Sequence, residues 1–88
     1  MIDYYLDVVK ERIAEKKDFT VARHGIAWQF VRYTFGWNVH CSRARLELYA
    51  EKIVFDNGNI KLIGEATDSE FGIIYLHDFT IAYKGVKE

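Results

Sequence analysis

The sequence has no proline, a single cysteine and almost no net charge. Without proline there is no proline-rich linker or rigid spacer. Cys41 alone cannot form an intramolecular disulfide, which is typical of a reducing compartment. Twelve basic residues against thirteen acidic ones give a net charge of −1, unlike the basic footprint of a duplex-DNA-binding domain. No apolar run approaches the roughly 20 residues of a membrane helix. We therefore expect a cytoplasmic protein with no membrane partner.

The chain is rich in apolar residues. Half of its 88 residues are hydrophobic and 16% are aromatic. This is enough for a packed core, and it is not the composition of a disordered chain. The length suits one domain and is too short for two. We expect residues 1–88 to form a single domain.

Three segments have the spacing of helices. In residues 2–17 the apolar stripe is formed by Ile2, Tyr5, Leu6, Val9 and Ile13. In residues 26–36 the polar residues Gln29, Arg32 and Gly36 share one narrow stripe, which predicts a mostly buried helix. A strand would instead place Arg32 on an otherwise apolar face. After Ser42, a residue that can cap a helix, the third stripe is formed by Leu46, Tyr49, Ala50 and Ile53.

Strand-like runs occupy residues 19–22, 38–41, 71–76 and 79–83. The sharpest local signal is Asn57-Gly58, because these residues suit the two positive-φ positions of a type I′ hairpin turn. Counting outward from this turn places Phe55 opposite Ile60 and Ile53 opposite Leu62. Both pairs fall on one face, so the sequence predicts a hairpin with a self-consistent register.

The order of these segments favours an α/β fold. Helices between strands predict parallel crossovers, and we expect a small sheet of two or three layers with parallel core strands plus the β-hairpin. The alternative is an α+β fold in which residues 38–83 form an antiparallel meander with helices on one face. Clean alternation over residues 73–83 supports that alternative.

Four segments together resemble the ATPase core of phage terminase large subunits and related P-loop motors: residues 19–25, 38–42, 55–58 and 73–78. They resemble, in turn, a first strand with its phosphate loop, a second strand, a hairpin turn and a Walker B strand ending at Asp78. The resemblance implies a phage origin, but the chemical groups are missing. Gly25 is not followed by the lysine and hydroxyl of a phosphate loop, and Phe79 stands where a glutamate would activate water. We expect no ATP hydrolysis and no cofactor.

One possible chemical cluster follows from the parallel sheet. His24, His40 and His77 each end a predicted strand, and ligands bind at that edge of an open parallel sheet. With Cys41 and Asp78 beside them, these histidines would suit zinc or a small metal-dependent enzyme. Asp78 would alternatively orient a histidine acting as a base. The histidine spacings, however, match no zinc-binding pattern.

Two kinds of macromolecular contact are further possibilities. Arg32, Arg43 and Arg45 would contact phosphates beside stacked aromatic rings if the protein were a nucleic-acid-binding accessory factor. A helix apolar on three sides is hard to bury in so small a domain, so surplus apolar side chains predict an interface: Tyr4, Val8, Trp28 and Trp37. With no complete catalytic motif, the sequence favours a non-enzymatic interaction or regulatory protein, with a protein partner or a second copy of itself.

Overall fold

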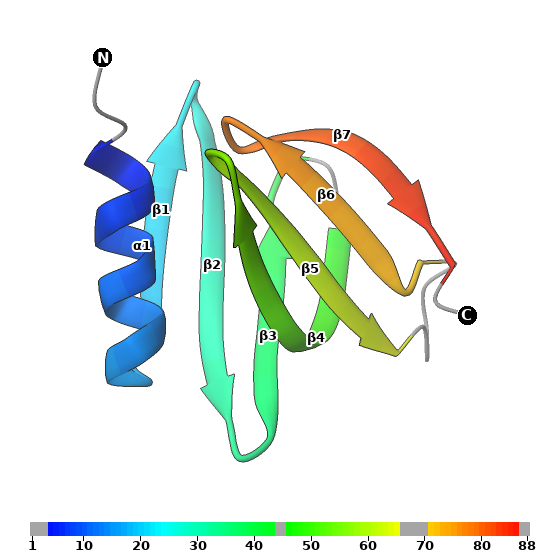
Figure 1. Ribbon diagram of the computed structural model, residues 1–88, viewed down its shortest axis with the longest axis horizontal. Coiled ribbons are helices and arrows are strands. Elements are labelled where there is room, and N and C mark those ends of the chain that lie inside the picture. Colours follow the sequence, from blue (N-terminus) through cyan, green and yellow to red (C-terminus); the bar gives the residue numbers. More distant parts are fainter. Residues whose placement is uncertain (1–3, 44–45, 66–70, 87–88) are drawn as a thin grey trace.

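The computed structural model describes residues 4–43, 46–65 and 71–86. Within these ranges the chain forms one helix and seven strands (Figure 1). The elements are α1 (Tyr4–Glu15), β1 (Phe19–Arg23), β2 (Ile26–Tyr33), β3 (Gly36–Cys41), β4 (Leu46–Asp56), β5 (Asn59–Glu65), β6 (Ile73–His77) and β7 (Thr80–Gly85). None of the helical structure in these ranges has the length and hydrophobicity required to span a bilayer.

The seven strands form a single sheet in chain order, β1 to β7, and every neighbouring pair is antiparallel. The predicted α/β fold with parallel core strands is therefore wrong, and the fold is mainly β. The antiparallel meander considered over residues 38–83 is closer, but it extends from β1 to β7 and has one helix beside it rather than several on a face.

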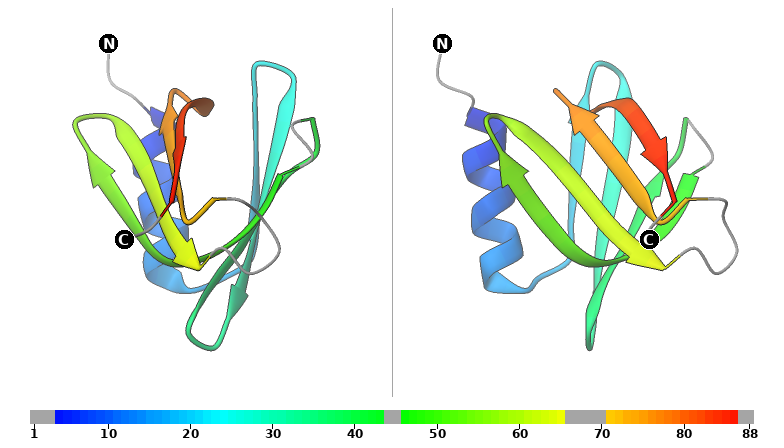
Figure 2. Two further views of the ribbon diagram at one scale, coloured as in Figure 1. Left: turned by 90° about the vertical axis from the view of Figure 1, so that its right-hand side faces the viewer. Right: turned by 45° about the vertical axis from the view of Figure 1, so that its right-hand side comes forward.

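A bend in the long strand β4 brings the two halves of the sheet face to face (Figure 2). The pairing of β4 with β5 shifts register between Ala50 and Lys52, as in a β-bulge, and a bulge bends and twists a strand. Gly64 lies opposite Ala50, and a Cβ at Gly64 would overlap the carbonyl oxygen of Tyr49. Only glycine therefore allows the two strands to approach this closely.

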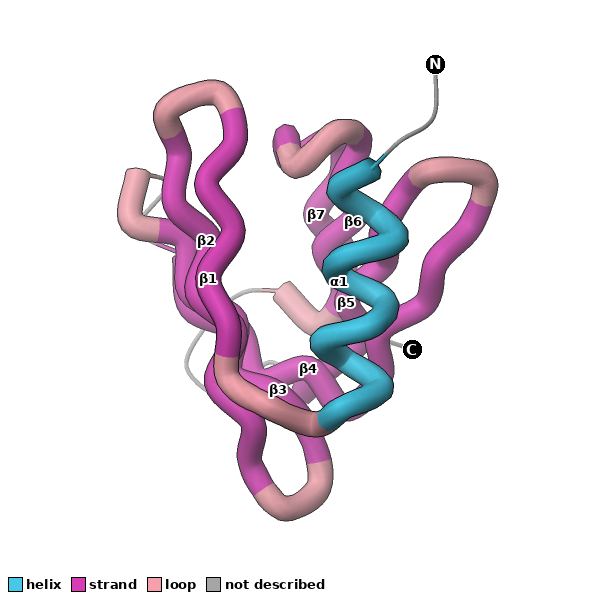
Figure 3. Tube along the Cα trace, turned by 90° about the vertical axis from the view of Figure 1, so that its left-hand side faces the viewer, coloured by secondary structure: helices cyan, strands magenta, loops and turns pink. Residues whose placement is uncertain are grey.

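Helix α1 lies beside the open side of the curled sheet, between β1 and β5 (Figure 3). Leu6 and Val9 of its apolar stripe are buried in the core, as the sequence predicts. Lys10 reaches back over the ring of Phe55, 5.5 Å from its centroid, and ties the helix to β4. The core itself comes from alternate residues of the strands: Trp28 and Phe30 of β2, Val39 of β3, Leu62 of β5, and Ile74 and Leu76 of β6.

Residues 26–36 are not a helix but the strand β2 and its turn into β3. Trp28 and Phe30 are buried, whereas Ala27 and Gln29 are exposed, which is the alternation of a half-buried strand. Arg32 follows on the buried side, yet it lies where the sheet ends. Its guanidinium donates to the Gly36 carbonyl at 3.0 Å and lies 5.4 Å from the centroid of the Trp37 ring. The charge is thus accommodated without a helix.

The helix predicted after Ser42 is also wrong, because its apolar stripe, Leu46 to Ile53, lies in β4. Leu46, Leu48 and Ala50 are buried, and after the bulge the partly buried positions are Ile53 and Phe55. The bulge therefore moves the inward-facing positions from even to odd numbers. Apolar residues therefore stand at positions 46, 50 and 53, which is also the spacing of an apolar stripe on a helix. This coincidence explains why a helix was predicted.

The hairpin at Asn57-Gly58 is confirmed. Both residues have positive φ, +48° and +83°. Phe55 pairs with Ile60 and Ile53 with Leu62, in the predicted register. This feature could be predicted because the turn residues and the flanking alternation act over only a few residues.

Candidate functional site

Two tight turns from opposite ends of the chain meet at one edge of the fold. His24 and Gly25 join β1 to β2, and Asp78 and Phe79 join β6 to β7. All four residues have positive φ, between +50° and +73°. Such φ values match the twist of two-residue hairpins but are unusual for a bulky side chain such as Phe79.

The carboxylate of Asp78 holds the two turns together. The Arg23 Nε donates to Asp78 Oδ1 at 2.9 Å, and the His24 Nε2 lies 2.8 Å from Asp78 Oδ2. The His24 hydrogen bond, followed by that of Arg23, lowers the pKa of Asp78 below its ordinary value. We call Arg23, His24 and Asp78 the clasp. Because all three side chains are partly exposed, the clasp lies at the surface.

A second connection lies directly beneath the clasp. The Trp28 indole Nε1 donates to the Phe79 carbonyl oxygen at 3.1 Å, and the two rings lie 6.5 Å apart. Both side chains are buried, with 1% and 2% exposure. Burial of the Phe79 ring and this hydrogen bond offset the strain of its left-handed backbone.

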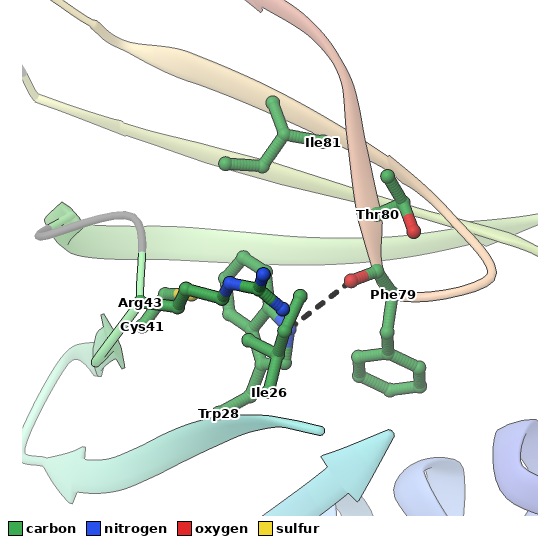
Figure 4. A pocket seen from close by; sticks show the side chains of 7 residues that line it. All are labelled: Ile26, Trp28, Cys41, Arg43, Phe79, Thr80 and Ile81. Carbon is green, nitrogen blue, oxygen red and sulfur yellow. Dashed lines mark hydrogen bonds between the residues drawn. The ribbon is translucent and has the colours of Figure 1, made fainter. Parts of the chain in front are cut away.

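A cavity of about 260 Å³ opens beside Trp28, between β2 and β3 on one side and β7 on the other (Figure 4). Its wall is mostly apolar, and its lining residues are Ile26, Trp28, Cys41, Arg43, Phe79, Thr80 and Ile81. In Figure 4 Arg43 extends from beyond the end of β3 toward Trp28, and Ile81 extends from β7 over the same space.

The far end of β2 carries a different surface. The β2–β3 hairpin projects beyond the body of the sheet (Figures 1 and 3). Tyr33 is 51% exposed and Phe35, in the turn, is 83% exposed. The Tyr33 ring lies 5.8 Å from that of Tyr49 on β4, and a Cβ at Gly36 would meet the Tyr49 ring at 3.1 Å. We call Tyr33, Phe35 and Tyr49 the aromatic tip.

The histidines proposed as metal ligands lie on three separate elements. His24 is in the clasp; His40 pairs with Gln29 and Glu47 in the sheet; the His77 Nδ1 lies 2.7 Å from the Asn59 Oδ1. No group of three or more His, Cys, Asp or Glu side chains able to hold a metal occurs in residues 4–43, 46–65 and 71–86. The shared edge on which that prediction rested belonged to a parallel sheet, which is absent there.

Of the predicted chemistry, the structure brings together only the pairing of a histidine with Asp78, and the histidine is His24. Cys41 is buried and lies in the cavity wall, not beside the clasp. A histidine and an aspartate in contact can act as a base and its orienting group. Here, however, Asp78 is shared with Arg23, so its evident role is to join the two turns.

The predicted nucleic-acid and interface residues are also dispersed. Arg32 is held in the β2–β3 turn, Arg43 is exposed beside the cavity, and Arg45 lies outside the described residues. Trp28 and Trp37 are core residues, with 1% and 4% exposure. Val8 is 37% exposed on α1, and the side chain of Tyr4 is outside the described part of the structure.

The sequence interpretation missed both the clasp and the aromatic tip. Tyr33 and Phe35 stand out only when residues 26–41 are recognised as a hairpin, since Thr34 and Phe35 then occupy its turn. The His24-Gly25 dipeptide, flanked by Ala22 and Ala27 in register, was the available signal for the preceding hairpin, between β1 and β2, whose turn carries the clasp.

Comparisons of this chain with protein-family models, with curated protein sequences and with solved structures found no match. What the chain does must therefore be argued from its own residues.

Proposed function

We propose that this chain is a non-enzymatic protein-interaction or regulatory module that binds a protein through its aromatic tip. The proposal is carried by the exposure of Phe35, 83% of which faces solvent at the end of a projecting hairpin. Aromatic side chains are enriched at protein interfaces, where they bury a large area with few rotatable bonds.

The setting of Phe35 supports a preformed binding surface. The rings of Tyr33 and Tyr49 pack against each other at the base of the same hairpin, and Arg32 closes the turn by donating to the carbonyls of Thr34 and Gly36. The Arg32 backbone N–H also donates to the Asp18 carboxylate at 2.7 Å. A turn held by three such bonds loses little conformational entropy when it docks, which favours binding.

A cytoplasmic location fits the free thiol of Cys41, since a reducing compartment preserves it. The same surface also serves a second copy of the chain in this proposal. The resemblance to terminase ATPase cores has no part in it, because the parallel sheet that the resemblance implies is absent from the described strands.

The test combines affinity capture from the source cell with sedimentation of the purified chain at micromolar concentration. We expect a specific protein partner or a dimer for the native chain. The double variant Tyr33→Ser, Phe35→Ser should lose this binding while keeping its circular dichroism spectrum.

The matched control is Tyr83→Ser, which removes an aromatic side chain that is 60% exposed on β7, away from the aromatic tip. It should bind as the native chain does. If the chain is monomeric and captures no partner, or if the double variant binds normally, the proposal is wrong.

A further inference from the structure

We infer that the cavity between β2, β3 and β7 is a binding site for a small apolar carboxylate, such as a short-chain fatty acid anion. This site is distinct from the aromatic tip, at the opposite end of β2, and would give the chain a ligand as well as a protein partner. The inference rests on the size of the cavity, its apolar wall and the charge at its mouth.

The size sets the class of ligand. Taking about 30 Å³ for each water-sized group, a cavity of about 260 Å³ holds a molecule of about nine non-hydrogen atoms. This is slightly below the range of drug-sized pockets, roughly 300–1,000 Å³. Hexanoate and octanoate match this volume, whereas nucleotides are too large to fit inside.

The apolar wall provides the binding energy for a hydrocarbon chain. Ile26, Trp28 and Ile81 supply aliphatic and aromatic surface from two different elements. The one indole N–H in the wall already donates to the Phe79 carbonyl, so it is not left in need of a partner. A wall of this kind favours burial of methylene groups over burial of polar ones.

Charge complementarity selects the carboxylate. Arg43 lines the cavity and is exposed, and it makes no hydrogen bond or ion pair within the described residues. A guanidinium has five donors in a plane that match the two oxygens of a carboxylate. The Thr80 hydroxyl adds a further donor in the cavity wall.

The test is calorimetric titration of the full chain with sodium hexanoate, sodium octanoate and the neutral 1-hexanol. We expect the carboxylates to bind more tightly than the alcohol. Arg43→Gln should weaken carboxylate binding about tenfold, the effect of losing about 1.4 kcal/mol, and leave alcohol binding unchanged. Arg12→Gln is the control, because it removes one positive charge from the surface of α1.

A second pair of variants tests the location. Thr80→Phe adds bulk inside the cavity and should abolish binding of both probes. Ala82→Phe introduces the same ring at an exposed position of β7 that does not line the cavity, and should bind normally. The inference is overturned if neither carboxylate binds at millimolar concentration, if 1-hexanol binds as tightly, or if Arg43→Gln binds hexanoate like the native chain.

Discussion

The two ends of strand β2 are built in opposite ways. At its first residue, Ile26, the strand emerges from a turn that the clasp ties to the distant β6–β7 turn. At its last residue, Tyr33, it leads into a turn that projects into solvent with Phe35 uncovered. Hydrophobic side chains are buried at the first end and displayed at the second.

This difference separates the contacts that stabilise the fold from the surface proposed to bind a protein along one strand. The clasped end joins residues about 50 positions apart in the chain, so its contacts hold the curled sheet together. The projecting end makes mostly local contacts within β2, β3 and β4. Changes at the clasped end should therefore alter folding, and changes at the projecting end should alter binding alone.

The largest effect is expected from Gly64→Ala, which opposes the bend that brings the clasped end together. The new Cβ would overlap the backbone of Tyr49, so β4 and β5 must separate. We expect a loss of about 3 kcal/mol or more in the free energy of unfolding, measured in urea. Gly25→Ala, with no atom within 4 Å of the new Cβ but a φ of +73°, should lose only about 1 kcal/mol. Equal losses would show that close approach at Gly64 is unimportant.

The next effect is expected from Trp28→Phe at the clasped end. The change leaves the Phe79 carbonyl without the indole donor and opens space in the core. The free energy of unfolding should fall by about 2–3 kcal/mol. Trp37→Phe removes the same volume from the core without breaking the hydrogen bond between the two hairpins. Measured by the same urea titration, Trp37→Phe should therefore lose less free energy of unfolding than Trp28→Phe. A larger loss for Trp37→Phe would contradict the role given to the hydrogen bond between Trp28 and Phe79.

The clasp itself should make stability depend on pH. The pKa of Asp78 is lowered in the folded state, first by His24 and then by Arg23, so its carboxylate stabilises the fold above the unfolded value near 3.9. That contribution is lost as the pH falls through the lowered folded value. Between pH 5 and pH 2 the melting temperature of the native chain should therefore fall further than that of Asp78→Asn. His24→Asn should remove the larger part of this difference, and parallel curves for all three proteins would refute it.

The smallest effect is expected at the projecting end. Phe35→Ser removes a ring that is 83% exposed, so the free energy of unfolding should change by no more than about 0.5 kcal/mol. Urea unfolding of this variant and of the native chain measures the difference. A loss of more than about 1 kcal/mol would mean that Phe35 packs against the fold, and the contrast between the two ends of β2 would fail.

The fold predictions that local signals decide were correct, and those that depended on tertiary contacts were wrong. The helix near the N-terminus and the Asn57-Gly58 hairpin were predicted correctly, because apolar spacing and turn chemistry act within a few residues. Residues 26–36 misled because Arg32 looked incompatible with a strand, and its compensation by the Gly36 carbonyl and the Trp37 ring depends on the turn itself. The stripe at Leu46, Ala50 and Ile53 misled because a bulge shifted the alternation.

The amino-acid sequence by itself determined one small domain, its first helix, the strand-like runs that become β1, β3, β6 and β7, and the central turn with its register. It also determined the apolar content that must be buried. Tertiary structure alone decided that the strands outside the central hairpin are antiparallel, that β4 bends where Gly64 meets Ala50, and that Asp78 reaches Arg23 and His24. The physical reason is that turns and helix stripes are encoded by near neighbours. The clasp and the cavity arise from residues that become neighbours only when the sheet curls.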